Sequence, residues 1–387
     1  MALHVHVRTA DHRDSRFRDN RSRLDRLRQP EGSQSVETSL IGNTTKREET
    51  MLKKFLVTVS FVAATLLAGG RAQAEEPTKL RIAGILSAGK EAPWESSFVI
   101  SMDRIIAAKP HGLDIEINYT ENVYENAEQV FRTYAETGEY DILFGDTAYV
   151  DAIEKLKDEF PDTMFVMSGS GNRGLGGNAY WIFIHAHEPA YVMGQLAGKL
   201  TKSNVVSAVS TFPAEDTNDQ INAFFAGAKE VNPKVKQKIT FIQSWFDPAK
   251  SNEATSAQIA AGADMIYQMS GAFEVCEERG IGCFGNYVDM SKVAPKSIVA
   301  STIVKWDPHI NWIIDEWWKA KTTGAKFDAP KEPKWFTWQE GSGELAVNPA
   351  WEAKMPDDVK ALAAETAKAI QSGEKKIGLK LDEPKSD

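Results

Sequence analysis

The stretch that most constrains the fold is residues 80–102, LRIAGILSAGKEAPWESSFVISM. Its first six residues are apolar apart from Arg81, and a polar loop with glycine and proline follows them. After Trp94 the apolar residues take a helical spacing. A strand, a loop and a helix in this order form the first βα unit of an α/β sheet. Ligands bind beyond the carboxyl ends of strands in such sheets, so the indole of Trp94 is a candidate ligand contact.

The βα rhythm repeats in two groups. Strand and helix patterns alternate up to residue 184, and again from residue 191 to residue 284. The tail then adds a strand pattern at 298–303, a helix at 308–321, a strand at 335–339 and a last helix ending at Ser372. We therefore predict an α/β protein with two parallel-sheet domains joined by a hinge around a cleft. The predicted N-terminal lobe comprises residues 75–185 and about 304–330, and the C-terminal lobe residues 186–303 and about 331–387.

The residues before these lobes are predicted to serve export. Residues 1–50 are rich in Arg, Asp and His and show no apolar periodicity, so they cannot bury a core. Residues 51–74 combine two lysines, a short apolar run and an Ala-x-Ala site, the pattern of a cleaved signal peptide. We expect translation to start at Met51; the alternative is a genuine disordered basic leader. Because no Cys stands at the cleavage site, the predicted product is periplasmic and not lipid-anchored.

The charge balance bears on the kind of partner, and the cysteine content on the state of the thiols. Asp and Glu number 54 and Lys and Arg 45, so nothing favours a nucleic-acid partner. Cys276 and Cys283 are the only cysteines. A local disulfide is one interpretation, but we predict two buried free thiols, because a short separation across a helix–strand turn rarely gives bridge geometry.

Polar and aromatic residues follow several predicted strands at once. Trp94 from one lobe and Trp245 from the other are placed to stack on both faces of a flat ring. A purine or another aromatic heterocycle fits this pairing, since stacking contributes roughly 1–3 kcal/mol per base. Carboxylate and amide side chains would form hydrogen bonds with the edge of the ring. The candidate ligand-binding residues are Trp94, Glu95, Asn126, Asp146, Trp245, Asp247, Gln268, Asp289 and Lys305.

Each candidate also has a structural interpretation. A tryptophan more often packs in a core than contacts a ligand. Asp247 precedes Pro248 and is equally suited to cap a helix, and Asp146 is suited to cap the helix pattern that follows it. Lys305 lies where the chain would cross between the lobes.

Enzyme and metal functions find little support. The sequence contains no G-x-S-x-G, P-loop or H-E-x-x-H motif. His185 and His187 have a spacing that suits a metal, but only Glu188 is near them in sequence. We predict no cofactor, no metal and no catalytic residue. A periplasmic hydrolase remains as an alternative of another class, although no nucleophile–base pair is visible.

Several motifs, taken in order, resemble those of one family. They include residues 141–145 (DILFG), 244–248 (SWFDP), 262–264 (GAD), 284–286 (FGN) and 355–359 (MPDDV). Together they are similar to the basic-membrane-protein (PnrA-like) family of substrate-binding proteins of ABC transporters, in its purine-base-binding branch. The resemblance implies a type I periplasmic-binding fold, a purine base or nucleoside in the cleft, and delivery to a membrane permease with an ATPase.

The same resemblance assigns roles to four residues. It implies that Trp94 and Trp245 sandwich the base, that Asp289 is the family's acid after a later strand, and that Lys305 is its hinge lysine. The first loop departs from the family's Asp-x-Ser-Phe-Asn signature, since residues 90–96 read KEAPWES. We expect a monomer that binds by hinge closure; the alternative ligand is another small polar, sugar-like molecule.

Overall fold

The first of two sheets is built from five strands of the N-terminal half of the chain and one strand near its C-terminal end. The computed structural model describes residues 76–171, 173–245 and 247–387, which belong to one unit. The predicted leader and signal peptide lie outside the described residues. All strand pairs of the first sheet are parallel, in the order β11-β5-β4-β3-β1-β2. Its strands are β1 (Lys79–Ile85), β2 (Asp114–Thr120), β3 (Ile142–Gly145), β4 (Met164–Ser168), β5 (Ala179–Ile184) and β11 (Lys334–Phe336).

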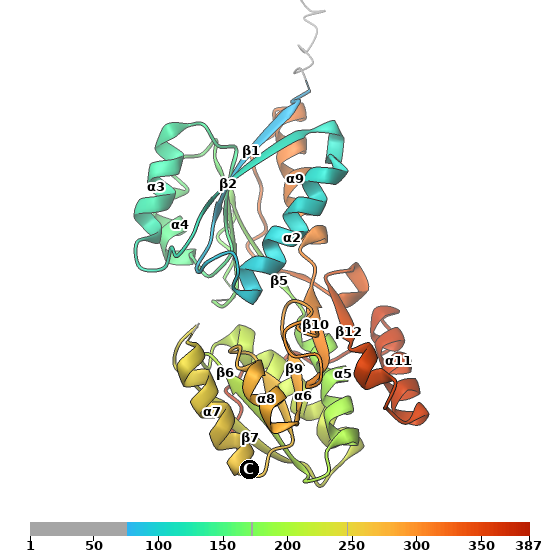
Figure 1. Cartoon of the computed structure of the whole chain (residues 1–387). Helices are drawn as coiled ribbons and strands as arrows, with labels where there is room; N and C mark the ends of the chain where they lie inside the picture. Colours follow the sequence, from blue (N-terminus) through green and yellow to red (C-terminus); the bar gives the residue numbers. More distant parts are fainter. Residues whose placement is uncertain (1–75, 172, 246) are drawn as a thin grey trace, which may run out of the picture. The chain divides into compact units, whose positions relative to one another are not determined.

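Helices cover both faces of this sheet, as Figure 1 shows. Alternate side chains of β1 point to opposite faces, so Ile82 packs with one pair of helices and Ile85 with the other. The first pair is α2 (Pro93–Ala108) and α9 (Asp307–Thr323), and the second is α3 (Ala127–Thr137) and α4 (Val150–Leu156). A short 3-10 turn, η1 (Pro110–Gly112), follows α2. We call this sheet and its helices the first lobe.

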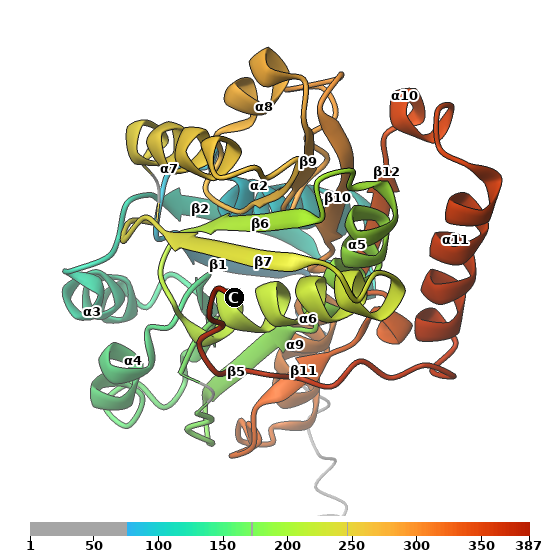
Figure 2. The ribbon, with the colours of Figure 1, turned by 90° about the horizontal axis from the view of Figure 1, so that it is seen from below.

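The second sheet has the order β12-β10-β9-β8-β6-β7 and is parallel except for β12, which runs antiparallel to β10. Its strands are β6 (Val205–Ser210), β7 (Lys236–Phe241), β8 (Met265–Gln268), β9 (Gly282–Gly285), β10 (Ile298–Val304) and β12 (Gly343–Val347). One face packs against α5 (His187–Leu200), α6 (Glu215–Val231) and α11 (Asp357–Gln371), and the other against α7 (Pro248–Ala260) and α8 (Phe273–Arg279). Figure 2 shows α7 and α8 on one side of strands β6 and β7 and α6 on the other. With η2 (Trp338–Glu340) and α10 (Pro349–Glu352) these elements form the second lobe.

The chain passes between the lobes three times, after β5, after β10 and after β11. Backbone hydrogen bonds join these crossings, from His185 N to Phe336 O (2.9 Å) and from Lys305 N to Ser342 O (2.9 Å). The predicted boundary near residue 330 is therefore placed too early. Residues 334–336 pair with β5 and belong to the first sheet, and the expected strand at 335–339 ends at Phe336, where η2 follows.

Helices α5 and α6 contact each other through glycines. A Cβ on Gly194 would lie 1.8 Å from Phe224 O, and one on Gly227 would lie 2.0 Å from Tyr191 O. Neither distance is possible for real atoms, so the two helix backbones are close enough that only glycine fits at these positions.

The C-terminal tail covers the open edge of the second sheet. Asp387 and Gln237 of the edge strand β7 exchange hydrogen bonds of 3.0 Å, and Ile239 N donates to Ser386 Oγ (2.9 Å). Further along, Asn218 of α6 donates to Leu381 O at 3.0 Å. Figure 2 shows the C-terminus beside α6 and β7. An edge strand occupied in this way is not available for pairing with another chain.

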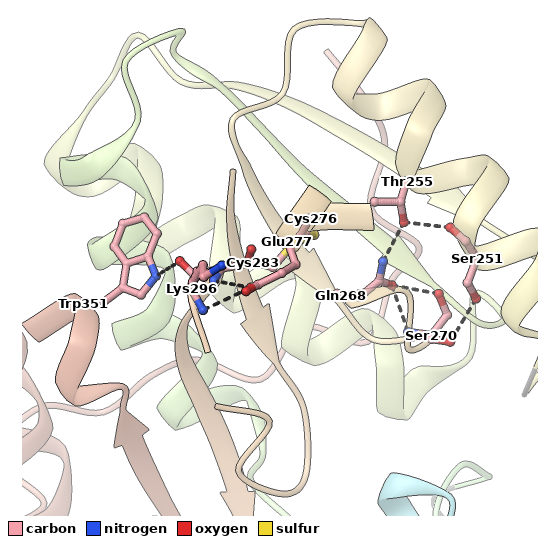
Figure 3. The surroundings of a disulfide bond; sticks show 10 residues. Ser251, Thr255, Gln268, Ser270, Cys276, Glu277, Cys283, Lys296 and Trp351 are labelled. Carbon is pink, nitrogen blue, oxygen red and sulfur yellow. Dashed lines mark hydrogen bonds between the residues drawn. A yellow bond between two sulfur atoms is a disulfide. The ribbon is translucent and has the colours of Figure 1, made fainter. Parts of the chain in front are cut away.

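The prediction of two free thiols is wrong. Cys276 and Cys283 form a disulfide, with Cα atoms 6.2 Å apart (Figure 3). Gly280 ends α8 in the left-handed conformation (φ 65°), and Ile281 N donates to Cys276 O. This reversal sends β9 back along the end of α8, which brings the two cysteines within bridge distance.

We expect this disulfide to add to stability although it closes a short loop. The chain-entropy relation gives about 2 kcal/mol for a loop of this size. A protein carrying Cys276→Ser and Cys283→Ala should lose about that much free energy of unfolding in urea. Adding a reductant should lower the stability of the parent and leave the double variant unchanged; equal sensitivity of the two proteins would contradict the assignment.

Candidate ligand-binding site

A cavity lies between the two lobes, at the carboxyl ends of their parallel strands. It encloses about 840 Å³, counting space open to solvent, which is within the range of small-molecule sites. Loops and helix starts of both lobes contribute to its wall. Four aromatic rings, two carboxyl groups and several hydroxyl groups line it, from Trp94, Tyr124, Trp245, Tyr287, Glu95, Asp216, Ser87, Thr147, Thr211, Thr217 and Ser270.

Trp94 is held rigidly on the first-lobe wall. Pro93 and Trp94 begin α2, where proline costs no helical hydrogen bond. The indole Nε1 donates to Asp146 O at 2.8 Å. Its ring packs edge-on against Tyr287 and Trp306, each with a centroid separation of 4.9 Å. The indole is therefore pre-positioned before any ligand arrives.

Glu95 and Asp146 form a buried carboxyl pair beside this indole. Glu95 is 3% exposed and Asp146 is fully buried. Glu95 Oε1 accepts from Ser87 Oγ (2.7 Å) and from Ala88 N (3.0 Å), while Asp146 Oδ1 accepts from Ser87 N (3.0 Å). Burial raises the pKa of both carboxyls, and the charge of Glu95 raises the pKa of Asp146 further.

The second-lobe wall carries another carboxyl at the start of α6. Asp216 accepts a hydrogen bond from Ser170 Oγ of the first lobe (2.5 Å), and Gly171 N donates to Glu215 Oε2 (3.2 Å). Burial raises the pKa of Asp216 to about 6. These contacts join the lobes at one side of the cavity and leave a second acidic group in its wall.

Trp245 stands at the mouth of the cavity. Its side chain is 40% exposed and packs on Phe212 with a centroid distance of 5.0 Å. The indole Nε1 lies 3.3 Å from the hydroxyl of Tyr124 on the opposite lobe, to which it donates. Trp245 is thus less constrained than Trp94, and its ring is open to a ligand.

Tyr287 completes the aromatic wall and is held by the hinge region. It is a non-glycine residue in the left-handed conformation (φ 68°). Its hydroxyl accepts from Gln220 Nε2 (3.2 Å), and its carbonyl accepts from Val304 N (2.9 Å). The ring that faces Trp94 is therefore connected to β10, next to the second crossing.

The structure brings three predicted residues together and places two more behind them. Trp94, Glu95 and Trp245 line the cavity. Asp146 lies beneath the wall, where its carbonyl holds Trp94. Gln268 is fully buried and accepts from Ser270, a lining residue, while it donates to Thr255 at 2.6 Å (Figure 3).

Four predicted residues do not line the cavity. Asn126 is exposed at the start of α3, and Asp289 accepts from Ser291 N in its own loop (2.9 Å). Asp247 caps α7 by accepting from Lys250 N (3.0 Å), as its structural interpretation required. Lys305 forms an ion pair with Glu344. Local backbone donors thus occupy the side chains of Asp247 and Asp289.

Sequence reasoning missed the contributions of Tyr287, Asp216 and the hydroxyl residues of the wall. Tyr287 follows Asn286 at a predicted strand end, so the strand-end rule offered a signal for it. Asp216 lies in the first turn of α6, which begins at Glu215.

His185, His187 and Glu188 cluster at the first crossing, with ligand atoms within 4.8 Å of one another. His187 Nε2 donates to Ile377 O (3.1 Å), and Nδ1 lies 3.7 Å from Asp219 Oδ2. Burial alone would lower the pKa of His187, but Asp219, the Ile377 carbonyl and Glu188 together outweigh burial and the pKa is raised. The arrangement pairs a buried imidazole with a buried carboxyl, and we assign it no metal.

Comparison with known proteins identifies relatives that cover most or about half of the chain. A family model described as ABC transporter substrate-binding protein PnrA-like matches residues 89–328. A purine-binding protein of Brucella abortus is 30% identical over 325 residues, covering 82% of this chain and 87% of that protein. A putative ABC transporter glucose-binding protein of Haloferax volcanii is 30% identical over 226 residues, covering 54% and 57%.

Solved structures share the fold. An ABC transporter solute-binding protein of Aeropyrum pernix aligns with a TM-score of 0.65 at 16% identity, covering 78% of this chain and 94% of that one. This likeness confirms the predicted two-lobed α/β fold of the type I periplasmic-binding proteins. In the described part of the chain, no helix combines the length and apolarity that a membrane span requires.

Proposed function

Because the chain belongs to the PnrA-like family of ABC-transporter substrate-binding proteins, we propose that it captures a purine base or nucleoside in the cavity between its lobes. The family consists of solute-binding proteins, not enzymes, which bind small molecules and work with a membrane permease and an ATPase. Family members typically act outside the cytoplasm or in the periplasm. We further propose that this chain is exported by residues 51–74, acts as an unanchored monomer in the periplasm, and delivers its ligand to such a transporter.

The observation that carries this proposal is the pair of indoles on opposite walls of one cavity. Trp94 is fixed in the first lobe, and Trp245 is exposed at the mouth in the second. A flat ring between them would contact both lobes at once, with roughly 1–3 kcal/mol from stacking. Such contacts exist only when the lobes are closed, so the ligand would favour the closed state.

The charge of the cavity wall indicates which class of ligand the cavity suits. Among the described residues that line the cavity none is Lys, Arg or His, whereas Glu95 and Asp216 are acidic. A phosphate group would meet no cation there and would be repelled by both carboxylates. The wall therefore suits a neutral base or nucleoside better than a nucleotide.

A thermal-shift screen tests the proposal. Adenine, hypoxanthine, their nucleosides, AMP, glucose, myo-inositol and amino acids are each added to the purified protein. We expect bases or nucleosides to raise the melting temperature, because a ligand at 100 times its Kd stabilises the native state by about 2.7 kcal/mol. AMP should have little effect at the same concentration.

A sugar-like ligand is the second candidate, favoured by the similarity to a putative glucose-binding protein and by the hydroxyl groups of the wall. A shift with sugars and none with purines would replace the purine assignment and leave the fold and the transport role intact. Shifts with neither class at millimolar concentration would argue against both.

A further inference from the structure

The carboxyl pair beside Trp94 combines one group in the cavity wall with one beneath it. Glu95 lines the cavity and Asp146 does not. Ser87 joins them, since its hydroxyl donates to Glu95 and its backbone N–H to Asp146. Both of the donors that reach Glu95 go to Oε1. Asp146 Oδ2 is buried with no hydrogen-bond partner among the described residues.

Among the described residues, no cationic side chain lowers the pKa of Glu95 or Asp146. Burial raises the pKa of the Tyr149 phenol, and the charges of both carboxyls raise it further. The Tyr149 hydroxyl donates to Val123 O (2.5 Å). The phenol of Tyr124 raises the pKa of Tyr149 as well, and Tyr124 lines the cavity. Across the cavity stands Asp216, whose own pKa is raised first by burial and then by Asp219 and Glu215.

Two neighbouring buried carboxyls without a cation do not both ionise near neutral pH. A buried carboxylate oxygen without a partner is costly, whereas a protonated one carries a hydrogen that can be donated. Asp146 Oδ2 is the buried carboxyl oxygen without a hydrogen-bond partner among the described residues, and Asp146 is more deeply buried than Glu95. Glu95, with two donors on Oε1, is the better site for the remaining negative charge.

We propose that Asp146 carries a proton in the ligand-free protein, which leaves Glu95 as an ionised acceptor that selects ligands presenting an N–H to the cavity. This inference rests on the proposed function and specifies the ligand class further, to bases whose exposed edge donates through a ring N–H or an exocyclic amino group. A base whose exposed edge carries only hydrogen-bond acceptors would be repelled by the carboxylate. The affinity for N–H donors should fall as the pair takes up its second proton.

The direction of the pH effect follows from the raised pKa of Glu95. As the pH falls, Glu95 is protonated earlier than an ordinary carboxyl and ceases to be an anion. A ligand that donates to the anion lowers the pKa of Glu95 in the complex, so binding near that pKa releases a proton to the buffer. Above the pKa of Glu95, binding is strong and releases no proton.

Titration calorimetry with adenine, from pH 5 to pH 8 and in two buffers of different ionisation enthalpy, tests the inference. In the unaltered protein we expect the affinity to fall as the pH is lowered from 7.5 to 5, with proton release on binding at the acid end. N6,N6,9-trimethyladenine, which has the ring but no N–H, should bind weakly and without this pH dependence.

Glu95→Gln should reduce the affinity for adenine at least tenfold at pH 7.5 and flatten the pH profile. The matched control is Glu91→Gln, which removes the same charge from an exposed position in the same loop outside the cavity wall and should behave like the parent. If Glu95→Gln does not fold, Asp216→Asn replaces it in the test: proton release on adenine binding should persist in that variant, and its loss would assign the titration to Asp216.

Two results would overturn the inference while leaving the proposed function in place. One is adenine binding that is independent of pH and releases no proton. The other is a full pH dependence in Glu95→Gln, which would assign the titration to Asp216. Failure of every purine to bind the unaltered protein at any pH would instead refute the proposed function.

Discussion

Replacing Trp94 with alanine is expected to abolish the rise in melting temperature that a purine ligand causes. The substitution removes one stacking face, worth roughly 1–3 kcal/mol, and with it the fixed surface that orients the ring. It also removes the hydrogen bond to Asp146 O and the edge-on contacts with Tyr287 and Trp306. Calorimetry with adenine measures the loss, which we expect to exceed thirtyfold, or about 2 kcal/mol.

Two further variants separate binding from stability. Trp94→Phe retains an aromatic face without the indole N–H, and should recover part of the affinity. Trp245→Ala removes the other ring at an exposed position, so it should weaken binding with little change in the melting temperature of the free protein. An unchanged ligand-induced shift in Trp94→Ala would return Trp94 to a purely structural role.

Among the described glycines, Gly194 is the position where replacement with alanine is expected to cause the largest loss of stability. The new Cβ would lie 1.8 Å from Phe224 O, a backbone atom that no side-chain rotation can move. Helices α5 and α6 would have to separate, and their contact forms much of the core on one face of the second sheet. Overpacking of this kind costs about 3 kcal/mol or more.

Urea unfolding of Gly194→Ala against the parent measures this cost. Gly378→Ala is a suitable control, because its Cβ would have no neighbour within 4 Å and its backbone is not left-handed. That variant should lie within about 0.5 kcal/mol of the parent. A Gly194→Ala protein as stable as the control would show that the helices can move apart at little cost.

The rule that ligands bind beyond strand ends selected three residues that line the cavity, Trp94, Glu95 and Trp245. Two others that it selected, Asp247 and Asp289, do not line the cavity, and their side chains accept from backbone N–H groups two or three residues away. Short-range hydrogen bonds of this kind depend on turn geometry that residue type alone does not specify.

Other features depend on residues far apart in the chain. Tyr287 reaches the cavity because of its left-handed backbone and the amide of Gln220 from another element. Strand β12 is short and only half buried, and so it carries no clear periodicity. The disulfide requires the reversal at Gly280, and a count of intervening residues does not predict that reversal. The fold class followed from the βα rhythm, which is a local property repeated many times.

The triple crossing between the lobes has a consequence for how the chain folds. β5 ends at Ile184 and its sheet neighbour β11 begins at Lys334, with most of the second lobe between them. The first sheet cannot acquire its edge strand until that intervening segment is in place, and closing so long a loop is slow. The first lobe is therefore not an autonomous folding unit, since its edge strand β11 is supplied by chain that follows most of the second lobe.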